Sequence, residues 1–193
     1  INPDVKFYDN TLKEMINFSS SNDDYCILAP ISDDIRFPNY KIKNKEIGSN
    51  DNDYLSVDSV DGFAMLINKN KFKDNIYFDE NFFMYLENDD LCLRKKNENN
   101  LIYVLKKAKI NHLGGKSHSI IYEREIEYSR NWHWMWSKFY FNLKYYGYLI
   151  AFLKTLPSMI SSIIKILFYF LTINRYKKKN LFNEIFRIIQ FHD

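Results

Sequence analysis

Short apolar runs separated by polar stretches predict an α/β layer structure for the first 118 residues. Residues 25–29 and 101–110 are compact apolar runs of strand length, and residues 88–96 have a composition that suits a helix. Residues 54–68 first alternate between apolar and polar and then become continuously apolar, which is typical of a strand buried on both faces. This order of helices and strands is typical of proteins in which helices pack on a sheet.

A further helix is predicted near the start of the chain, because Thr11 and Glu14 match the pattern of a helix capping box. The apolar residues expected on one face of this helix follow at helical spacing: Leu12, Met15 and Ile16. Residues 30–53 are polar and contain proline and glycine, so they predict a long surface loop. Gly62 interrupts the next apolar pattern and marks either a bulge or a place where a ligand approaches the backbone.

From residue 119 onward the pattern is helical, with no strand signal. Residues 148–173 are strongly apolar, but two lysines and a proline interrupt them, and the remaining run is far shorter than the ~20 residues that span a bilayer. A basic cluster at residues 175–179 and an amphipathic segment at residues 181–191 follow. This combination predicts helices that lie on a membrane surface, and the alternative is a helical subdomain packed on the body or on another subunit.

The net charge of +3 conceals opposite charges on the two parts, −3 for residues 1–118 and +6 for residues 119–193. The basic, aromatic-rich part is therefore expected to face an anionic surface, and nucleic acid is not expected as a partner. The 5 glycines form no Gly-rich nucleotide loop. The 2 cysteines, Cys26 and Cys92, lie far apart in no metal or disulfide pattern, so a reducing compartment is expected.

The most informative stretch is residues 78–94, F-D-E-N-F-F-M-Y-L-E-N-D-D-L-C-L-R. It places Glu87, Asp89 and Asp90 directly after a block of aromatic residues. Carboxylates held beside apolar surface can have raised pKa values or share a cation, which would suit a catalytic site. The alternative interpretation is structural, since acidic residues also stabilise the first turn of a helix.

Three motifs in order resemble family 2 glycosyltransferases, in particular their rhamnosyltransferase-like and galactofuranosyltransferase-like branch. I-N-P-D-V at residues 1–5 is similar to a variant of the DxD metal motif, and residues 78–94 are similar to the acidic signature of the branch. I-N-H-L-G-G-K-S at residues 110–117 resembles its closing motif. Between the first two of these motifs, S-V-D-G-F-A-M-L-I-N at residues 59–68 is similar to a family strand that carries a Gly-Ala pair.

The resemblance covers residues 1–118 and implies an α/β fold there, a partial GT-A mixed sheet. The pattern of residues 119–193 predicts that a helical, basic-aromatic and membrane-associated extension follows it. The resemblance also implies that the N-terminal nucleotide-binding half is lacking, so the chain is expected to be an inactive fragment of a longer enzyme. By position, Asp4 and His112 match the residues that hold a divalent cation, Mn²⁺ or Mg²⁺, and Glu87 matches the general base. The positions matched to substrate binding or to the framework around it are Asp61, Gly62, Asn88, Asp90, Arg94, Gly114, Gly115, Lys116 and Ser117.

Three residues depart from the family pattern. Asn2 replaces the first acid of the metal motif, Asn88 replaces the second acid of the acidic signature, and Phe63 stands where an alanine follows the glycine. Fewer charged ligands would weaken metal binding. A larger residue after Gly62 would narrow the part of the active site that receives the acceptor.

The function that the resemblance implies is metal-dependent, inverting transfer of a sugar from a nucleotide-sugar donor to a glycan or lipid-linked acceptor, in cell-surface polysaccharide biosynthesis. The expected location is cytoplasmic, peripheral at the inner face of the cell membrane, with homo-oligomerisation through the C-terminal helices as a further possibility. The alternative is a non-catalytic membrane-surface or assembly module whose acid cluster is structural. Calcium binding is disfavoured by the spacing of the acids, and phosphoester hydrolysis by the sparse Asp/His set.

Overall fold

The computed structural model describes residues 1–42, 53–72, 76–112 and 123–172. The chain divides into two compact units, Ile1–Ser137 and Lys138–Asp193. The first unit combines strands and helices, and the described part of the second unit is helical. The predicted domain boundary between residues 118 and 119 lies outside the described residues.

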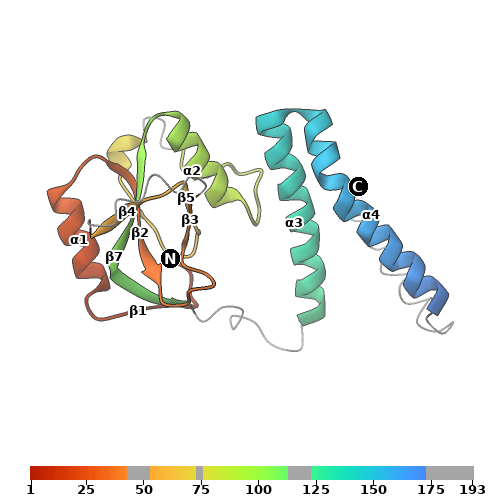
Figure 1. Cartoon of the computed structure of the whole chain (residues 1–193), viewed down its shortest axis with the longest axis horizontal. Helices are drawn as coiled ribbons and strands as arrows, with labels where there is room; N and C mark the ends of the chain where they lie inside the picture. Colours follow the sequence, from red (N-terminus) through yellow and green to blue (C-terminus); the bar gives the residue numbers. More distant parts are fainter. Residues whose placement is uncertain (43–52, 73–75, 113–122, 173–193) are drawn as a thin grey trace. The chain divides into compact units, whose positions relative to one another are not determined.

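A mixed, curled sheet forms the centre of the first unit (Figure 1), which confirms the predicted α/β class. Its strand order is β1-β7-β2-β6, and β4 also pairs with β7. Strands β2 and β7 are parallel, and the other pairings are antiparallel. A separate two-stranded sheet joins β3 to β5. The strands are β1 (Val5–Phe7), β2 (Tyr25–Ser32), β3 (Tyr40–Lys41), β4 (Tyr54–Ser56), β5 (Ser59–Val60), β6 (Leu66–Ile67) and β7 (Leu101–His112).

Strand β2 is the middle of the fold because apolar side chains cover both of its faces. Ile27 packs in the core cluster that includes residues of α2 (Glu87–Asn97), and Leu28 packs in the cluster that includes Met15 of α1 (Thr11–Ser21). Successive side chains of a strand point to opposite faces, so the two helices lie on opposite sides of the sheet (Figure 1). The predicted strands at residues 25–29 and 101–110 are confirmed, and both are longer than predicted.

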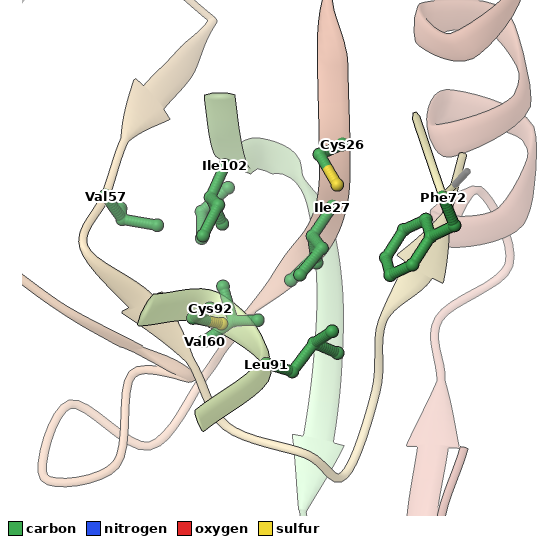
Figure 2. Packing of buried hydrophobic residues seen from close by; sticks show 10 residues of the cluster. Cys26, Ile27, Val57, Val60, Phe72, Leu91, Cys92 and Ile102 are labelled. Carbon is green, nitrogen blue, oxygen red and sulfur yellow. The ribbon is translucent and has the colours of Figure 1, made fainter. Parts of the chain in front are cut away.

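Figure 2 shows the cluster on the α2 side, where Ile27 and Ile102 of the parallel strands face Leu91 and Cys92 of the helix. Both cysteines are free and belong to this cluster. Burial raises the pKa of the Cys26 thiol to about 11 and that of Cys92 to about 12. The nucleophilic thiolate is therefore scarce at neutral pH, and the two cysteines serve packing rather than chemistry.

Helix α1 begins differently from the prediction. Asn10 is the N-cap residue and makes no side-chain cap hydrogen bond, so the capping box predicted at Thr11 is wrong. The Thr11 hydroxyl instead accepts from the Tyr8 backbone N–H and donates to the Lys109 carbonyl of β7. That contact turns Thr11 and Met15 toward the sheet. Of the three apolar residues predicted to share one face, Met15 is buried, whereas Leu12 and Ile16 are exposed.

The surface loop predicted at residues 30–53 is confirmed over residues 33–38, which form no strand and expose Ile35 and Phe37, and it is wrong on either side of them. Strand β2 continues to Ser32, β3 pairs with β5, and Asn39 is completely buried. The Asn39 side chain donates to the carbonyls of Pro30 and Ala64, at 2.7 and 3.3 Å. These bonds pin the connection to the sheet although its sequence is polar, which composition alone does not reveal. Residues 43–52 lie outside the described part.

Two short strands, β4 and β5, replace the single strand predicted at the start of residues 54–68. Gly62 lies in the turn that follows β5, and β6 comes after it. Phe63 and Ala64 are buried as predicted, whereas Leu66 and Ile67 are half-buried. A 3₁₀-helix, η2 (Lys69–Lys71), follows β6, and the helix predicted at residues 88–96 is confirmed as α2.

Helices α3 (Glu123–Tyr146) and α4 (Tyr148–Thr172) meet at Gly147, whose positive φ of 80° permits the sharp reversal between them. Within the second unit, Lys138 donates to Ser158 at 3.1 Å, and Phe139 packs edge-on against Tyr148. Among the described helices, none combines the length and the apolar character that membrane crossing requires.

Candidate functional site

The two residues matched to metal binding meet because of the sheet register. Val5 of β1 pairs with His112 at the carboxyl end of β7, so Asp4, just before β1, lies next to that histidine. The Asp4 Oδ2 and His112 Nε2 atoms are 3.4 Å apart. The carboxyl ends of the parallel strands β2 and β7 share this edge of the sheet, which is where open α/β sheets bind ligands.

The backbone around Asp4 is a turn that the sequence encodes. The Val5 N–H donates to the Asn2 carbonyl at 3.2 Å, with Pro3 at the second position, where its fixed φ suits a β-turn. The Asn2 N–H in turn donates to the carbonyl of Phe63 at 2.8 Å. Asn2, which lacks the acid of the metal motif, therefore anchors the turn through its backbone.

Phe63 also holds the other partner of the pair. Its ring stacks on the His112 imidazole, with centroids 4.2 Å apart and planes inclined by 16°. Phe63 is buried in a small cluster with Ala64 and Ile110. One residue thus fixes the turn that carries Asp4 through its carbonyl and the orientation of His112 through its ring.

Glu87 opens helix α2 in an unusual backbone setting. The two residues before it, Tyr85 and Leu86, both have positive φ, 69° and 64°, which is costly for side chains other than glycine. Glu87 Oε2 is buried and has no hydrogen-bond partner among the residues that the structure describes. Gly62 faces this carboxylate: a Cβ added there would lie 3.7 Å from Glu87 Oε1.

The other polar residues at the start of α2 have structural partners. The Asn88 side chain is buried and donates to the Val60 carbonyl at 2.7 Å. Asp90 has no exposed surface and pairs with Arg94 at 2.9 Å. Arg94 also donates to the carbonyl of Tyr77 at 2.6 Å, which fastens the segment leading into the acidic motif. These three side chains hold the helix in place, and the structural interpretation of the acids applies to Asp90.

A charged cluster joins the two halves of the site. Lys41 of β3 binds Asp89 at 2.9 Å and lies 3.9 Å from Asp61. Burial raises the pKa of Asp61; the Lys41 ammonium opposes this rise, Asp89 adds to it, and His112 opposes it slightly. Asp61 is therefore within electrostatic reach of both the acidic motif and the histidine.

A third polar group lies at the same edge of the sheet. Asp33, directly after β2, accepts hydrogen bonds from the Tyr8 hydroxyl at 2.6 Å and from the Asn111 side chain at 2.9 Å. The bond from Tyr8 lowers the pKa of Asp33, and Asn111 lowers it further. Because Asn111 precedes His112, this network braces the end of β7.

The first half of α3 holds the segment before Glu87 within the first unit. The Ser137 hydroxyl donates to the Met84 carbonyl at 2.6 Å, and the Trp136 indole donates to the Asn81 carbonyl at 3.2 Å. The two bonds hold both ends of the stretch 81–84, just before the strained pair, from outside the sheet, which stabilises a backbone that local propensity disfavours.

The described residues at this edge of the sheet offer few ligands for a cation. The described residues contain no group of three or more His, Cys, Asp and Glu side chains placed to bind a metal ion. Asp4 and His112 supply one carboxylate and one imidazole, a pair that fits a cation taking its other ligands from water and a bound diphosphate. Four of the residues predicted to bind substrate or support that site lie outside the described residues: Gly114, Gly115, Lys116 and Ser117.

No family model matches the chain, and neither a curated protein nor a solved structure matches it. The roles inferred from the resemblance therefore stay predictions. No local pattern points to Lys41, which lies in a segment predicted to be a surface loop. Phe63 was noticed only for its size after Gly62, and its contact with His112 depends on the sheet register.

Proposed function

We propose that the chain contributes the metal-binding and acceptor-activating part of an inverting GT-A glycosyltransferase. The observation that carries the proposal is the meeting, at one sheet edge, of the Asp4–His112 pair with Asp61 and Glu87. The three motifs that suggest the family are far apart in the sequence, and the fold brings their polar residues to one region. The partial α/β sheet is consistent with this assignment.

In the proposed reaction the bond between the anomeric carbon and the donor's phosphate oxygen breaks, and a bond to the acceptor oxygen forms. Glu87 takes the proton of the attacking hydroxyl, and the nucleoside diphosphate leaves with the bonding electrons. Asp4 and His112 would hold a divalent cation, whose chemistry here is to offset the charge of the diphosphate. Attack in a single displacement inverts the anomeric carbon.

The hydrogen bonds of the acidic residues support Glu87 as the base over its neighbours. Asp89 and Asp90 are occupied by Lys41 and Arg94, whereas Glu87 Oε2 has no partner in the described part of the chain. A general base must be free to accept a proton from a hydroxyl within hydrogen-bond reach. Gly62 leaves the space beside this carboxylate clear of a side chain.

The proposal is tested by sugar transfer with the natural protein that contains these residues. Sugar transfer from a panel of nucleotide sugars is compared for wild type, Glu87→Gln and Glu98→Gln. Glu98 lies at the far end of α2 and pairs with Lys95, so its variant controls for charge on the same helix. Glu87→Gln is expected to lower kcat by about 100-fold or more. Transfer near the wild-type rate would remove Glu87 as the base.

A non-catalytic module is the second candidate, and the structural partners of Asn88, Asp89 and Asp90 favour it. This candidate does not explain Glu87 Oε2, which is buried and has no partner among the described residues. A buried polar atom without a partner costs about 1–3 kcal/mol of folding free energy. Mn²⁺ titration separates the two. The catalytic candidate predicts that Asp4→Asn and His112→Ala each weaken Mn²⁺ binding, and the module predicts no change.

A further inference from the structure

Helix α4 exposes a continuous apolar stripe. Five large apolar side chains recur every three to seven residues along one side and are all exposed: Leu149, Leu153, Ile160, Ile164 and Leu167. Among the α4 residues whose burial the structure describes, the buried ones are small, Ala151 and Thr155. At 1.5 Å per residue the stripe is about 27 Å long, far more apolar surface in a row than a soluble helix normally leaves uncovered.

The charge of the surrounding sequence indicates what can cover the stripe. Residues 128–183 contain no aspartate or glutamate. They contain nine basic residues: Arg130, Lys138, Lys144, Lys154, Lys165, Arg175, Lys177, Lys178 and Lys179. A second copy of the hairpin would bring like charges together, whereas an anionic lipid surface would neutralise them. The described lysines can also keep their charge in water while their stems lie along apolar surface, as Lys154 does over the Tyr146 ring at 4.2 Å.

We propose that the α3–α4 hairpin docks on an anionic lipid bilayer, with the α4 stripe in the membrane interface and the lysines at the headgroups. The apolar side chains of the stripe would insert into the membrane interface, and the basic residues would give the preference for anionic lipid. The proposal does not depend on the transferase activity. It would hold for a non-catalytic module and would fail without affecting the Glu87 assignment.

The test is co-sedimentation of the full chain with vesicles of phosphatidylcholine alone or mixed with phosphatidylglycerol. Binding is expected on the mixed vesicles and should weaken about tenfold or more when salt rises from about 0.1 M to about 0.5 M. The stripe variant Leu153→Asp/Ile164→Asp should lose most binding. Its control, Leu12→Asp/Ile16→Asp on α1, changes the same residue types and the same charge.

The control is matched in exposure, since Leu153 and Ile164 are 55% and 59% exposed and Leu12 and Ile16 are 53% and 58% exposed. Far-UV circular dichroism verifies that both variants keep their helices. Equal losses from the two variants would mean that net charge alone drives binding and would overturn the assignment to α4. A different result would favour a second copy of the chain over lipid. In that case the wild type would be a dimer in light scattering and would not bind vesicles, and the stripe variant would be a monomer.

Discussion

The sheet edge of the first unit and helix α4 of the second differ in whether apolar side chains are buried and in whether charged side chains are paired. Around β2 the apolar side chains are buried on both faces, and the acids and Lys41 gather at one edge in mutual contact. In α4 the large apolar side chains are exposed, and the described residues of its unit include no acid to pair with the lysines.

This difference separates a structure that folds on its own contacts from one that needs a partner. Burial of apolar area gives the first unit its stability and leaves its polar groups available for a site. The hairpin gains little from burial within itself, because a helix that is apolar on its exposed side is stable mainly through what covers it. Each prediction below changes one region and uses the other, or its own matched residue, as reference.

The largest contrast is expected from one substitution made in both regions. Leu28→Ala removes a completely buried side chain at the centre of the sheet and should cost about 2–5 kcal/mol of unfolding free energy. Leu153→Ala removes an exposed side chain and should change that free energy by less than about 0.5 kcal/mol. Urea unfolding followed by circular dichroism measures both. Similar losses would show that the stripe is covered within the chain.

A second contrast lies inside the acidic motif. Asp90→Asn leaves the Arg94 guanidinium without its buried partner and should destabilise the first unit by about 3 kcal/mol. Asp89→Asn breaks a pair with the half-exposed Lys41 and should cost less than about 1 kcal/mol. The same unfolding experiment decides the order. If Asp89→Asn were the more damaging change, the framework role would belong to the Lys41 contact instead.

The pattern of apolar residues was sufficient to predict the α/β class, β2, β7 and α2, because these elements are strongly apolar or flanked by clear breaks. It was insufficient where a single polar contact decides the geometry. Thr11 rotates α1 by binding the Lys109 carbonyl, and buried Asn39 draws a polar segment against the sheet. Such contacts join residues distant in sequence, and no local period contains them.

The candidate site divides in the same manner. Asp4, His112 and Glu87 could be chosen from motifs, but their proximity depends on the pairing of Val5 with His112 and on the strained turn before α2. Lys41 could not be chosen at all, since a lysine in a polar stretch has no distinctive local pattern. Phe63 could be chosen only as a departure from the family pattern, and nothing local indicates its contact with His112. Register and turn geometry carry that information, and a one-residue slip of a strand would remove it.

A third prediction concerns the support of His112. Phe63→Leu keeps an apolar residue but removes the stacked ring, and Mn²⁺ binding should weaken about tenfold because residues that orient a metal ligand affect affinity on that scale. Phe72→Leu is the control, since Phe72 is also buried and also packs against an aromatic ring, that of Tyr77 in the core, although the two rings are tilted rather than stacked. The His112 ring resonances in NMR should also shift in Phe63→Leu, with or without metal. Unchanged resonances would exclude the positioning role.

The smallest expected effect is a change in Tm, which should have opposite signs when Asp61 and Asp34 are replaced. Because burial raises the pKa of Asp61, the folded state holds its proton more tightly than the unfolded chain does. Ionised Asp61 therefore lowers stability, fully so above its folded pKa and not at all below its ordinary pKa of 3.8. Asp61→Asn should raise the Tm at neutral pH, with the gain vanishing in acid.

Asp34 is the reference for that experiment, since hydrogen bonds from Arg36 lower its pKa. Ionised Asp34 adds stability above its ordinary pKa of 3.8, and this contribution disappears as the pH falls through the lower folded value. Asp34→Asn should thus lower the Tm slightly at neutral pH and have no effect in strong acid. Thermal melts of both variants across the acid range measure the two trends. Parallel shifts in the same direction would mean that Asp61 is stabilised as an ion by Lys41, and that its burial at the sheet edge is not the dominant influence.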